Sequence, residues 1–519
     1  MSEMPRTGAD ALVQTLAESG IDTCFANPGT TETHLVGALD RSSGIRPILG
    51  LFEGVCTGAA DGYARIARKP ASTLLHLGPG LANGLCHLHN ARKAHSPVIN
   101  LIGNHPRSHL QYDAPLSSDI AGLAEPVSGF VRQVAAPEEI AQDGADAVAA
   151  AWGPPGQIAS LIIPADCSWS AGPPPAKPAG RTPPKPAMDN DVRRVSELCA
   201  KGAMTALLIG AEGLTDSGLE HAGKIAAKTG VRLLAYTFEP LMQRGAGRVL
   251  IERIPYFPED AAKALSGLEH MVLCGAKEPV SFFSYPTGGG TLVPDGCALE
   301  TLVPVGGDVI TSLAALADHL GATAQGPVQA SNLPDMPSGA LTAESVSAMI
   351  ARAIPENSIV VDEGITVGFP AFTLSAGAAP HDWLFITGGG IGWALPVCVG
   401  AAVAAPERKV LCLHGDGGAM YTIQALWTMA RERLDVTTVI FSNKGYLILD
   451  IELQRHGLGP AGANAHRMMD MDDPRIDFVQ MAQAQGVDAH RVQDCAGLAR
   501  ALADCLARPG PHLIEAMMA

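Results

Sequence analysis

Two short polar turns, each directly after an apolar run, carry residue types that could hold a metal and a phosphate group. Residues 410–414 lead into the run GDGG, which contains Asp416, and residues 436–442 lead into Asn443 and Gly445. A carboxylate, an amide oxygen and a backbone carbonyl are hard oxygen ligands that suit Mg²⁺. Glycines let backbone N–H groups approach a diphosphate at the start of a helix. The pattern therefore predicts a metal–diphosphate site.

A parallel sheet is needed to bring these two turns together. Residues 410–414 and 436–442 read as buried strands, and residues 422–432 between them read as a helix. The carboxyl ends of parallel strands share one edge of the sheet, and ligands of such sheets bind beyond that edge. A bare GDG turn is common, but strand, GDG, helix, strand and Asn in this order favours a binding site over an ordinary turn.

A third polar group stands at the start of a helix in the first part of the chain. Residues 52–67 read as helical, and Glu53 lies among Leu51, Phe52 and Val55. A lone glutamate at this position is normally a surface residue that the helix dipole favours. The apolar neighbours predict instead that its carboxylate is partly buried.

Alternating strand and helix signals continue through the whole chain. Two proline-rich stretches, 172–188 and 326–339, read as extended linkers between segments of domain size. The alternation predicts the α/β class, with three doubly wound parallel-sheet domains at residues 1–171, 189–325 and 340–519. The expected strands are 23–25, 72–76, 98–103, 160–164, 206–210, 231–236, 270–275, 358–362, 410–414 and 436–442, and the expected helices are 7–19, 52–67, 219–229, 392–404 and 422–432.

The composition excludes several classes of protein. The 519 residues are 47% hydrophobic and carry a net charge of −16, which argues for several buried cores and against a nucleic-acid-binding surface. Residues 384–406 carry no charge and are long enough to span a membrane, but their five glycines and two prolines favour a buried segment. The 11 cysteines form no C-x-x-C pair, and the N-terminus lacks the apolar core of a signal peptide. We expect a cytoplasmic protein with no membrane partner.

The two turns, together with Glu53 and the run AADGYAR at residues 59–65, resemble motifs of the thiamine-diphosphate-dependent enzymes. The whole chain is similar in order to the acetolactate synthase large subunit and benzoylformate decarboxylase group: a pyrimidine-binding, a central and a diphosphate-binding domain. The resemblance implies thiamine diphosphate and Mg²⁺ as cofactors. It makes Asp416, Asn443 and the Gly445 carbonyl metal ligands. Glu53 would bond the pyrimidine ring and exchange the proton that activates the cofactor.

The resemblance implies further cofactor contacts in the third segment. The run GGGIG at 388–392 precedes a predicted helix, where a tight turn for close packing is the plain alternative. In the family, Gly389 would offer its carbonyl to the cofactor's amino group and Ile391 would wedge between its two rings. Thr366, after the expected strand 358–362, is the hydroxyl residue expected at the diphosphate. The remaining expected contacts are Gly415, Gly417, Gly418 and Tyr446.

Four residues are expected around the substrate. Thr30 matches a serine of benzoylformate decarboxylase, and His76 matches one of its two active-site histidines, although a histidine between leucines is usually a core residue. Phe283 stands where the second histidine is expected, which removes a proton donor and weakens the case for simple decarboxylation. Glu452 would face the substrate if its segment is helical, and is otherwise a solvated residue.

The first hypothesis is a decarboxylating carboligase that acts on a 2-oxo acid, similar to acetolactate synthase. The Gln-Trp pair of true acetolactate synthases is absent after Tyr446, and no flavin-binding run is found, so FAD is not expected. A benzoylformate-type decarboxylase is the alternative. A non-catalytic homologue with a regulatory or binding role is the alternative from another class. A Rossmann dehydrogenase is disfavoured because no G-x-G-x-x-G follows an early strand.

The resemblance also implies an oligomer. In the family, the diphosphate-binding domain of one subunit meets the pyrimidine-binding domain of another. Glu53 and Asp416 of one site would then come from different chains. We therefore expect at least a homodimer, and a homotetramer is common among relatives.

Overall fold

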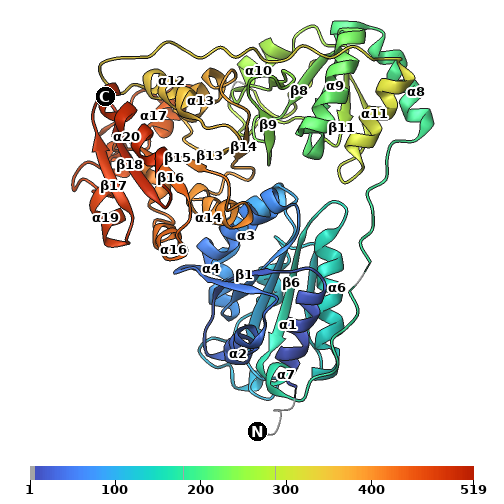
Figure 1. Ribbon diagram of the computed structural model, residues 1–519, viewed down its shortest axis with the longest axis vertical. Coiled ribbons are helices and arrows are strands. Elements are labelled where there is room, and N and C mark those ends of the chain that lie inside the picture. Colours follow the sequence, from blue (N-terminus) through green and yellow to red (C-terminus); the bar gives the residue numbers. More distant parts are fainter. Residues whose placement is uncertain (1–5, 179, 287) are drawn as a thin grey trace.

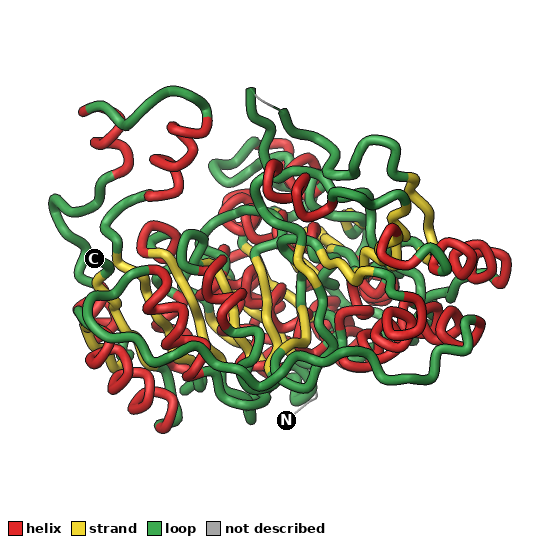
Figure 2. The backbone as a smooth tube through the Cα atoms, turned by 90° about the horizontal axis from the view of Figure 1, so that it is seen from above, coloured by secondary structure: helices red, strands yellow, loops and turns green. Residues whose placement is uncertain are grey.

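The computed structural model describes residues 6–178, 180–286 and 288–519. Residues 1–5 of the first expected domain, Ala179 in the first proline-rich stretch and Thr287 lie outside the described residues. Figure 1 shows three bodies, coloured blue, green and red from the N- to the C-terminal part, joined by two long extended segments. Each body is built around one sheet, and Figure 2 shows the strands lying between the helices.

The first sheet has the strand order β2-β1-β3-β4-β6-β5, and all its pairings are parallel. Its central strands are buried along their whole length because helices cover both faces. The strands are β1 (Thr23–Asn27), β2 (Arg46–Leu49), β3 (Ala71–Leu75), β4 (Val98–Asn104), β5 (Phe130–Gln133) and β6 (Ile158–Pro164). One face packs against α1 (Gly8–Glu18), α2 (Thr33–Arg41), α6 (Ile140–Trp152) and α7 (Ala165–Trp169), and the other against α3 (Glu53–Ala67), α4 (Leu77–Lys93) and α5 (Ile120–Ala124).

The second sheet is also parallel, with the order β10-β8-β7-β11-β12. Its strands are β7 (Thr205–Ile209), β8 (Arg232–Ala235), β10 (Glu252–Arg253), β11 (His270–Cys274) and β12 (Ala298–Val303). The helices α8 (Asp189–Cys199), α9 (Asp216–Thr229) and α11 (Val309–His319) cover one face, and α10 (Pro258–Leu265) covers the other.

The third sheet has the order β17-β18-β16-β15-β13-β14-β9. Its strands are β9 (Met242–Arg244), β13 (Ile359–Glu363), β14 (His381–Phe385), β15 (Val410–Gly415), β16 (Val436–Ser442), β17 (Asp488–Val492) and β18 (His512–Met517). Its core helices are α12 (Ala343–Ala353), α13 (Gly368–Leu374), α14 (Ala394–Ala404), α16 (Ala425–Glu432), α19 (Phe478–Ala484) and α20 (Cys495–Ala507), while α15 (Asp416–Ala419), α17 (Leu447–Arg455) and α18 (Ala463–Met469) belong to its loops.

One strand of the third sheet comes from the middle of the chain. β9 pairs antiparallel with β14, whereas the other pairings of this sheet are parallel. Arg244 of β9 is buried and donates to the carbonyl of Phe372 at 2.6 Å and to the hydroxyl of Ser375 at 2.7 Å. The middle segment is therefore joined to the third sheet by backbone pairing as well as by side chains.

The first and third bodies meet where α3 lies beside α14 (Figure 1). A side chain at Gly62 would overlap the carbonyl of Val397, and one at Gly400 would overlap the carbonyl of Ala59. The two backbones approach this closely because both positions are glycine. Hydrophobic residues of both bodies consequently form one continuous core.

A buried ionic group fixes this contact. Asp61 of α3 accepts hydrogen bonds from Arg65 and from the Trp393 indole, each at 2.8 Å. Arg65 also donates to the carbonyl of Phe385 at 2.8 Å. These side chains are almost completely buried, and the pair gains its hydrogen bonds to Trp393 and Phe385 only when the two bodies are docked.

The expected fold class is confirmed, and the observed elements begin and end within a few residues of the expected ones. The uncharged run 384–406 contains the end of β14, a turn and α14, as a buried segment should. Within the described residues, no helix combines the length and apolarity needed to cross a bilayer. All 11 cysteines are unpaired and nine are buried.

Candidate functional site

The two turns singled out in the sequence lie together at the carboxyl edge of the third sheet. β15 and β16 are neighbours, and Gly415 at the end of one pairs with Phe441 near the end of the other. The Asp416 carboxylate, which is 4% exposed, accepts from the backbone N–H of Gly417 at 2.8 Å and from that of Lys444 at 2.6 Å. One carboxylate thus joins both turns.

The donor groups at these turns fit a hard divalent cation. Burial raises the pKa of Asp416 to about 6, because its charged form is poorly solvated. Among the described residues, no cationic side chain forms an ion pair with it. Asn443 directly follows β16, the strand next to β15, and its side-chain oxygen accepts from the Gly445 N–H at 3.3 Å. The Asp416 carboxylate, which has no Lys or Arg partner among the described residues, and the Asn443 amide oxygen are together suitable ligands for Mg²⁺.

The expected cofactor residues follow four adjacent strands of this sheet. Thr366 follows β13, Gly389 and Ile391 follow β14, Gly415, Gly417 and Gly418 end or follow β15, and Gly445 and Tyr446 follow β16. All therefore gather at the edge of the sheet where ligands of such folds bind. A side chain at Gly417 would overlap the ring of Tyr446, so the aromatic ring covers this turn. Gly389 has a φ of +73°, which favours glycine.

A buried glutamate that the sequence reasoning did not select braces these loops. Glu363 ends β13 and is 2% exposed. Its two carboxylate oxygens accept from the backbone N–H groups of Gly392 at 2.6 Å and Ala394 at 2.7 Å. This bonding fixes the turn that carries Gly389 and Ile391. The available signal was an acidic residue at the carboxyl end of an apolar strand.

The surroundings of Glu363 perturb its titration. Burial raises the pKa of Glu363 to about 7, although the two backbone N–H groups oppose this change. His414 lies 3.5 Å from its carboxylate, and burial lowers the pKa of this imidazole to about 3. The neighbouring histidine therefore stays neutral and does not supply a positive charge to the carboxylate.

His76 lies at the carboxyl end of the first sheet, directly after β3, and is held by an acid. Its Nδ1 lies 2.7 Å from the carboxylate of Glu32. Glu32 is fully buried, and the same oxygen accepts from the Gly29 N–H at 2.8 Å. A carboxylate on Nδ1 fixes the orientation of the imidazole, and Nε2 is left for chemistry. Sequence reasoning found His76 but missed Glu32, which follows the NPGT run by two residues.

The hydroxyl closest to His76 comes from Thr31. Thr30 is exposed, and its backbone carbonyl accepts from Thr33. The Thr31 hydroxyl donates to Glu32 at 2.5 Å and lies 3.4 Å from Nδ1 of His76. Thr31 therefore belongs to the His76–Glu32 group, and Thr30 stands at its outer side.

Glu53 is the first residue of α3 and is half-buried, as its apolar neighbours predict. Asn83 of α4 donates to its carboxylate at 2.9 Å. Within the described part of the chain, its side chain makes no hydrogen bond to the third body. In the described structure, Glu53 and Asp416 therefore stand on separate bodies with no hydrogen bond between them.

Phe283 and Glu452, the other two residues expected near the substrate, lie on the middle and the third body respectively. Phe283 is 52% exposed and stacks edge-on with Phe282 at 5.0 Å between ring centroids. The segment that carries Glu452 is helical, and Glu452 accepts from the Tyr285 hydroxyl at 3.2 Å. Arg455 of the same helix pairs with Glu259 at 2.6 Å. These bonds tie α17 to the middle body.

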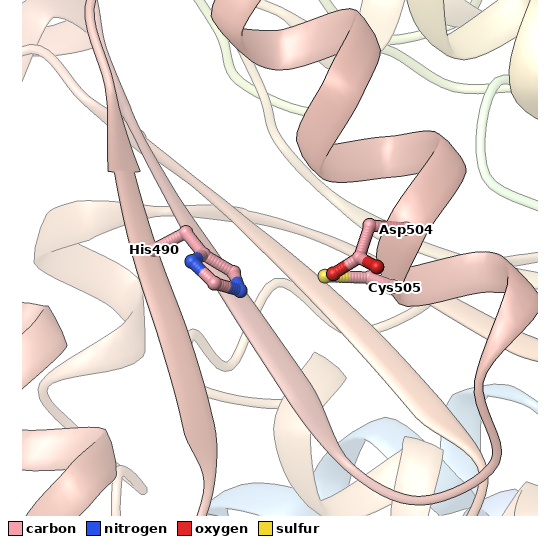
Figure 3. Close-up of side chains that lie close together, drawn as sticks. All are labelled: His490, Asp504 and Cys505. Atoms are coloured by element: carbon pink, nitrogen blue, oxygen red, sulfur yellow. The ribbon is translucent and has the colours of Figure 1, made fainter.

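A second group of metal-ligand types lies away from this site. Ligand atoms of His490, Asp504 and Cys505 lie within 4.8 Å of one another on β17 and α20 (Figure 3). The Arg508 guanidinium already donates to Asp504 at 2.7 Å. Burial raises the pKa of the Cys505 thiol to about 11, so this thiol keeps its proton. We assign no metal to this group.

Comparisons with known proteins agree with this arrangement. The family model of the N-terminal TPP-binding domain of thiamine pyrophosphate enzymes matches residues 6–125, and that of the C-terminal TPP-binding domain matches residues 371–516. A Mycobacterium tuberculosis protein provisionally named acetolactate synthase large subunit IlvX is 49% identical over 98% of this chain and 99% of its own length. Benzoylformate decarboxylase of Pseudomonas aeruginosa is 29% identical over 98% of each chain.

A solved structure shares the complete fold. The thiamine-diphosphate-dependent 4-hydroxybenzoylformate decarboxylase of Rhodococcus jostii RHA1 superposes with a TM-score of 0.87 at 24% identity, and 99% of each chain is covered. The likeness at this level of identity concerns the fold alone. The three sheets and their order are thus an arrangement already seen in a solved protein.

Proposed function

The chain belongs to the thiamine pyrophosphate enzymes, and on that premise we propose that it is a Mg²⁺-dependent, decarboxylating carboligase of 2-oxo acids. It would release CO₂ from a 2-oxo acid and join the remaining carbon unit to a second carbonyl compound. The name of the M. tuberculosis relative supports this reading.

The observation that carries the proposal is the Asp416 carboxylate, which joins the ends of β15 and β16. Asp416, Asn443 and the Gly445 carbonyl would hold Mg²⁺. The cofactor, when bound, supplies a nucleophilic carbon and an acceptor for the electrons of the broken C–C bond. The residues proposed to hold it are Thr366, Gly389, Ile391, Gly415, Gly417, Gly418 and Tyr446.

Glu53 is proposed to exchange a proton with the pyrimidine ring of the cofactor. A half-buried carboxyl group at the start of α3, oriented by Asn83, suits this task. Because the Glu53 side chain, within residues 6–178, 180–286 and 288–519, makes no hydrogen bond to the third body of its own chain, we propose that it serves the Asp416 site of a second chain. The working form would then be at least a homodimer, with a homotetramer as the form common among relatives.

Phe283 supports ligation as the main outcome. An aromatic side chain at this position cannot donate a proton, so the carbon unit left after CO₂ loss would stay available for reaction with a second carbonyl compound. The same half-exposed ring offers an apolar surface to that compound.

A benzoylformate-type decarboxylase is the second candidate, and the His76–Glu32 pair favours it. An imidazole held on Nδ1 by a buried carboxylate can donate a proton from Nε2. Such a donor would release an aldehyde after CO₂ is lost. Thr30, Thr31 and Glu452 would then shape the pocket around His76.

Product analysis separates the two candidates. The protein is incubated with thiamine diphosphate and Mg²⁺ and either pyruvate or benzoylformate, and the products are identified. Hydroxyketone formation is expected for the carboligase. Aldehyde as the sole product would overturn ligation in favour of the second candidate, and no turnover of any 2-oxo acid would favour a non-catalytic homologue.

Replacing Glu53 tests the mechanism common to both candidates. Glu53→Gln should lower kcat by about 100-fold or more, because an amide cannot exchange the proton. Binding of Mg²⁺ and thiamine diphosphate, measured by calorimetry, should change little. Glu344→Gln, at the exposed first turn of α12, is the matched control and should leave kcat unchanged. Full activity of Glu53→Gln would contradict the assignment.

A further inference from the structure

A cleft of about 560 Å³ lies between the first and third bodies. Its polar wall comes from Asp22, Arg46, Tyr63 and Lys69, and its apolar wall includes Val403 and Ala404 at the end of α14. Arg46 begins β2, and Asp22 directly precedes β1. The cleft therefore lies at the amino edge of the first sheet, opposite the edge that carries His76.

The Asp22 carboxylate in this cleft is held by hydrogen bonds from three neighbouring side chains. Asp22 accepts hydrogen bonds from the Tyr63 hydroxyl at 2.6 Å, from the Thr23 hydroxyl at 3.0 Å and from Lys69. The carboxylate is thus satisfied and holds the Lys69 ammonium in place. Asp22 and Lys69 thus form an ion pair whose two charges offset each other at the cleft.

The Arg46 guanidinium has N–H donors that are available to a ligand. One terminal nitrogen donates to Glu432 of α16 at 2.5 Å, and the side chain is 53% exposed. Within the described residues, its other N–H groups make no hydrogen bond to protein. A guanidinium with free donors in a planar fork recognises carboxylate and phosphate oxygens.

We propose that this cleft is a binding site for a small organic molecule that carries an oxyanion, either a carboxylate or a phosphate group. Arg46 and Lys69 bind the oxyanion, the Tyr63–Asp22 pair keeps Lys69 in position, and the end of α14 contacts the apolar part of the molecule. The volume falls within the usual range of small-molecule sites, roughly 300–1,000 Å³.

The cleft is connected to both halves of the candidate site by the two helices that line it. α3 begins with Glu53 and reaches the cleft with Tyr63 and Ala67, a distance of roughly 20 Å along its axis. α14 begins just after the turn braced by Glu363 and ends at the cleft with Val403 and Ala404.

These helices are packed backbone to backbone at Gly62 and Gly400, so a small shift of one is passed to the other. An oxyanion that draws Arg46 and Lys69 together acts on the far ends of both helices. The inference is therefore that occupancy of the cleft changes the affinity for thiamine diphosphate.

The test measures binding of three probes to the protein with thiamine diphosphate and Mg²⁺ present: succinate, glycerol 3-phosphate and, as a neutral control, glycerol. Calorimetry should give a Kd of about 1 mM or tighter for at least one oxyanion and no binding of glycerol. Tighter binding of succinate identifies a carboxylate site, and tighter binding of glycerol 3-phosphate identifies a phosphate site.

Three variants and one control variant locate the binding. Arg46→Gln and Lys69→Gln should each weaken it at least tenfold. Glu432→Gln should strengthen it, because Arg46 loses its competing partner. Arg193→Gln, on the exposed face of α8, should leave it unchanged. Equal binding by wild type and Arg46→Gln, or no binding of either oxyanion at 10-fold the expected Kd, would overturn the site.

The coupling is tested separately. The Kd for thiamine diphosphate is measured with and without a saturating concentration of the oxyanion that binds. A change of at least threefold in wild type, absent in Arg46→Gln, is expected; an unchanged Kd would overturn the coupling. None of these measurements uses turnover, so their failure leaves the proposed function untouched.

Discussion

Glu32 and Glu363 are both buried glutamates at the carboxyl edge of a parallel sheet, but their carboxylates bind different groups. Glu32, in the first body, shares an oxygen between the Gly29 N–H and the imidazole of His76. Glu363, in the third body, divides its oxygens between two backbone N–H groups. The first carboxylate can act on a reacting group through a side chain. The second can only fix the shape of a loop.

This difference predicts opposite kinetic results for the same chemical change. A Gln at either position keeps the size of the side chain and removes its charge. At position 32 the loss should appear in turnover, and at position 363 it should appear in cofactor binding and stability. Kinetics, unfolding and cofactor binding of the two Gln variants test this separation.

Glu32→Gln is expected to have the largest effect. Its amide cannot stabilise a positively charged His76, so kcat should fall several hundredfold, within the range of general acid–base contributions. The Kd for thiamine diphosphate should stay within about twofold, because the partners of the Glu32 carboxylate among the described residues are Gly29, Thr31 and His76, none of them a predicted cofactor contact. Steady-state kinetics measure the fall in kcat, and calorimetry measures the Kd for thiamine diphosphate. A weakened cofactor affinity with normal kcat would mean that Glu32 is a brace like Glu363.

The second prediction concerns pH. Glu363 has a pKa of about 7 in the folded protein against an ordinary 4.5, so the folded state binds its proton more tightly than the unfolded state. The free energy of unfolding should therefore fall as pH rises from 4.5 to 7, by up to about 3 kcal/mol from this residue. Glu363→Gln should lack this part of the slope.

Urea unfolding of the cofactor-free protein at pH 5 and pH 8 measures this slope. Other buried acids contribute as well, since burial raises the pKa of Glu239 to about 8. The difference between wild type and Glu363→Gln in the pH dependence of the free energy of unfolding gives the contribution of Glu363 alone. Parallel pH dependences for the two proteins would contradict the prediction.

The smallest effect is expected in cofactor binding by Glu363→Gln. The new NH₂ group faces a backbone N–H donor, so one of the two hydrogen bonds at the start of α14 is lost. The Kd for thiamine diphosphate should rise about tenfold, which corresponds to one hydrogen bond to a charged group. At saturating cofactor, kcat should remain within about threefold of wild type. A large fall in kcat with unchanged affinity would reverse the comparison.

The sequence predicts those candidate site residues that belong to a recognisable local pattern. The turns that contain Asp416 and Asn443 follow strands of clear apolar character, and the glycines beside them have a backbone reason to be there. The strand and helix order followed from the same alternation. These features depend on a few neighbouring residues.

The missed residues depend on distant contacts. Glu32 meets His76 only because β1 and β3 are neighbours in the sheet, and 44 positions separate them in the chain. The burial of Glu363 follows from the return of residues 392–394 over the end of β13. β9 has three residues, too few for a periodic signal, and its partner β14 lies more than 130 positions away.

The origin of β9 has a consequence for how this architecture can be taken apart. The two proline-rich stretches look like natural cutting points, yet a chain without its middle segment would expose the edge of β14 and its row of unpaired backbone groups. Such an edge is a template for pairing with another chain. Arg244 would leave with the excised part, and the carbonyl of Phe372 would lose its donor. Shuffling the middle body between relatives should therefore succeed only when the exchanged cassette brings its own copy of this strand.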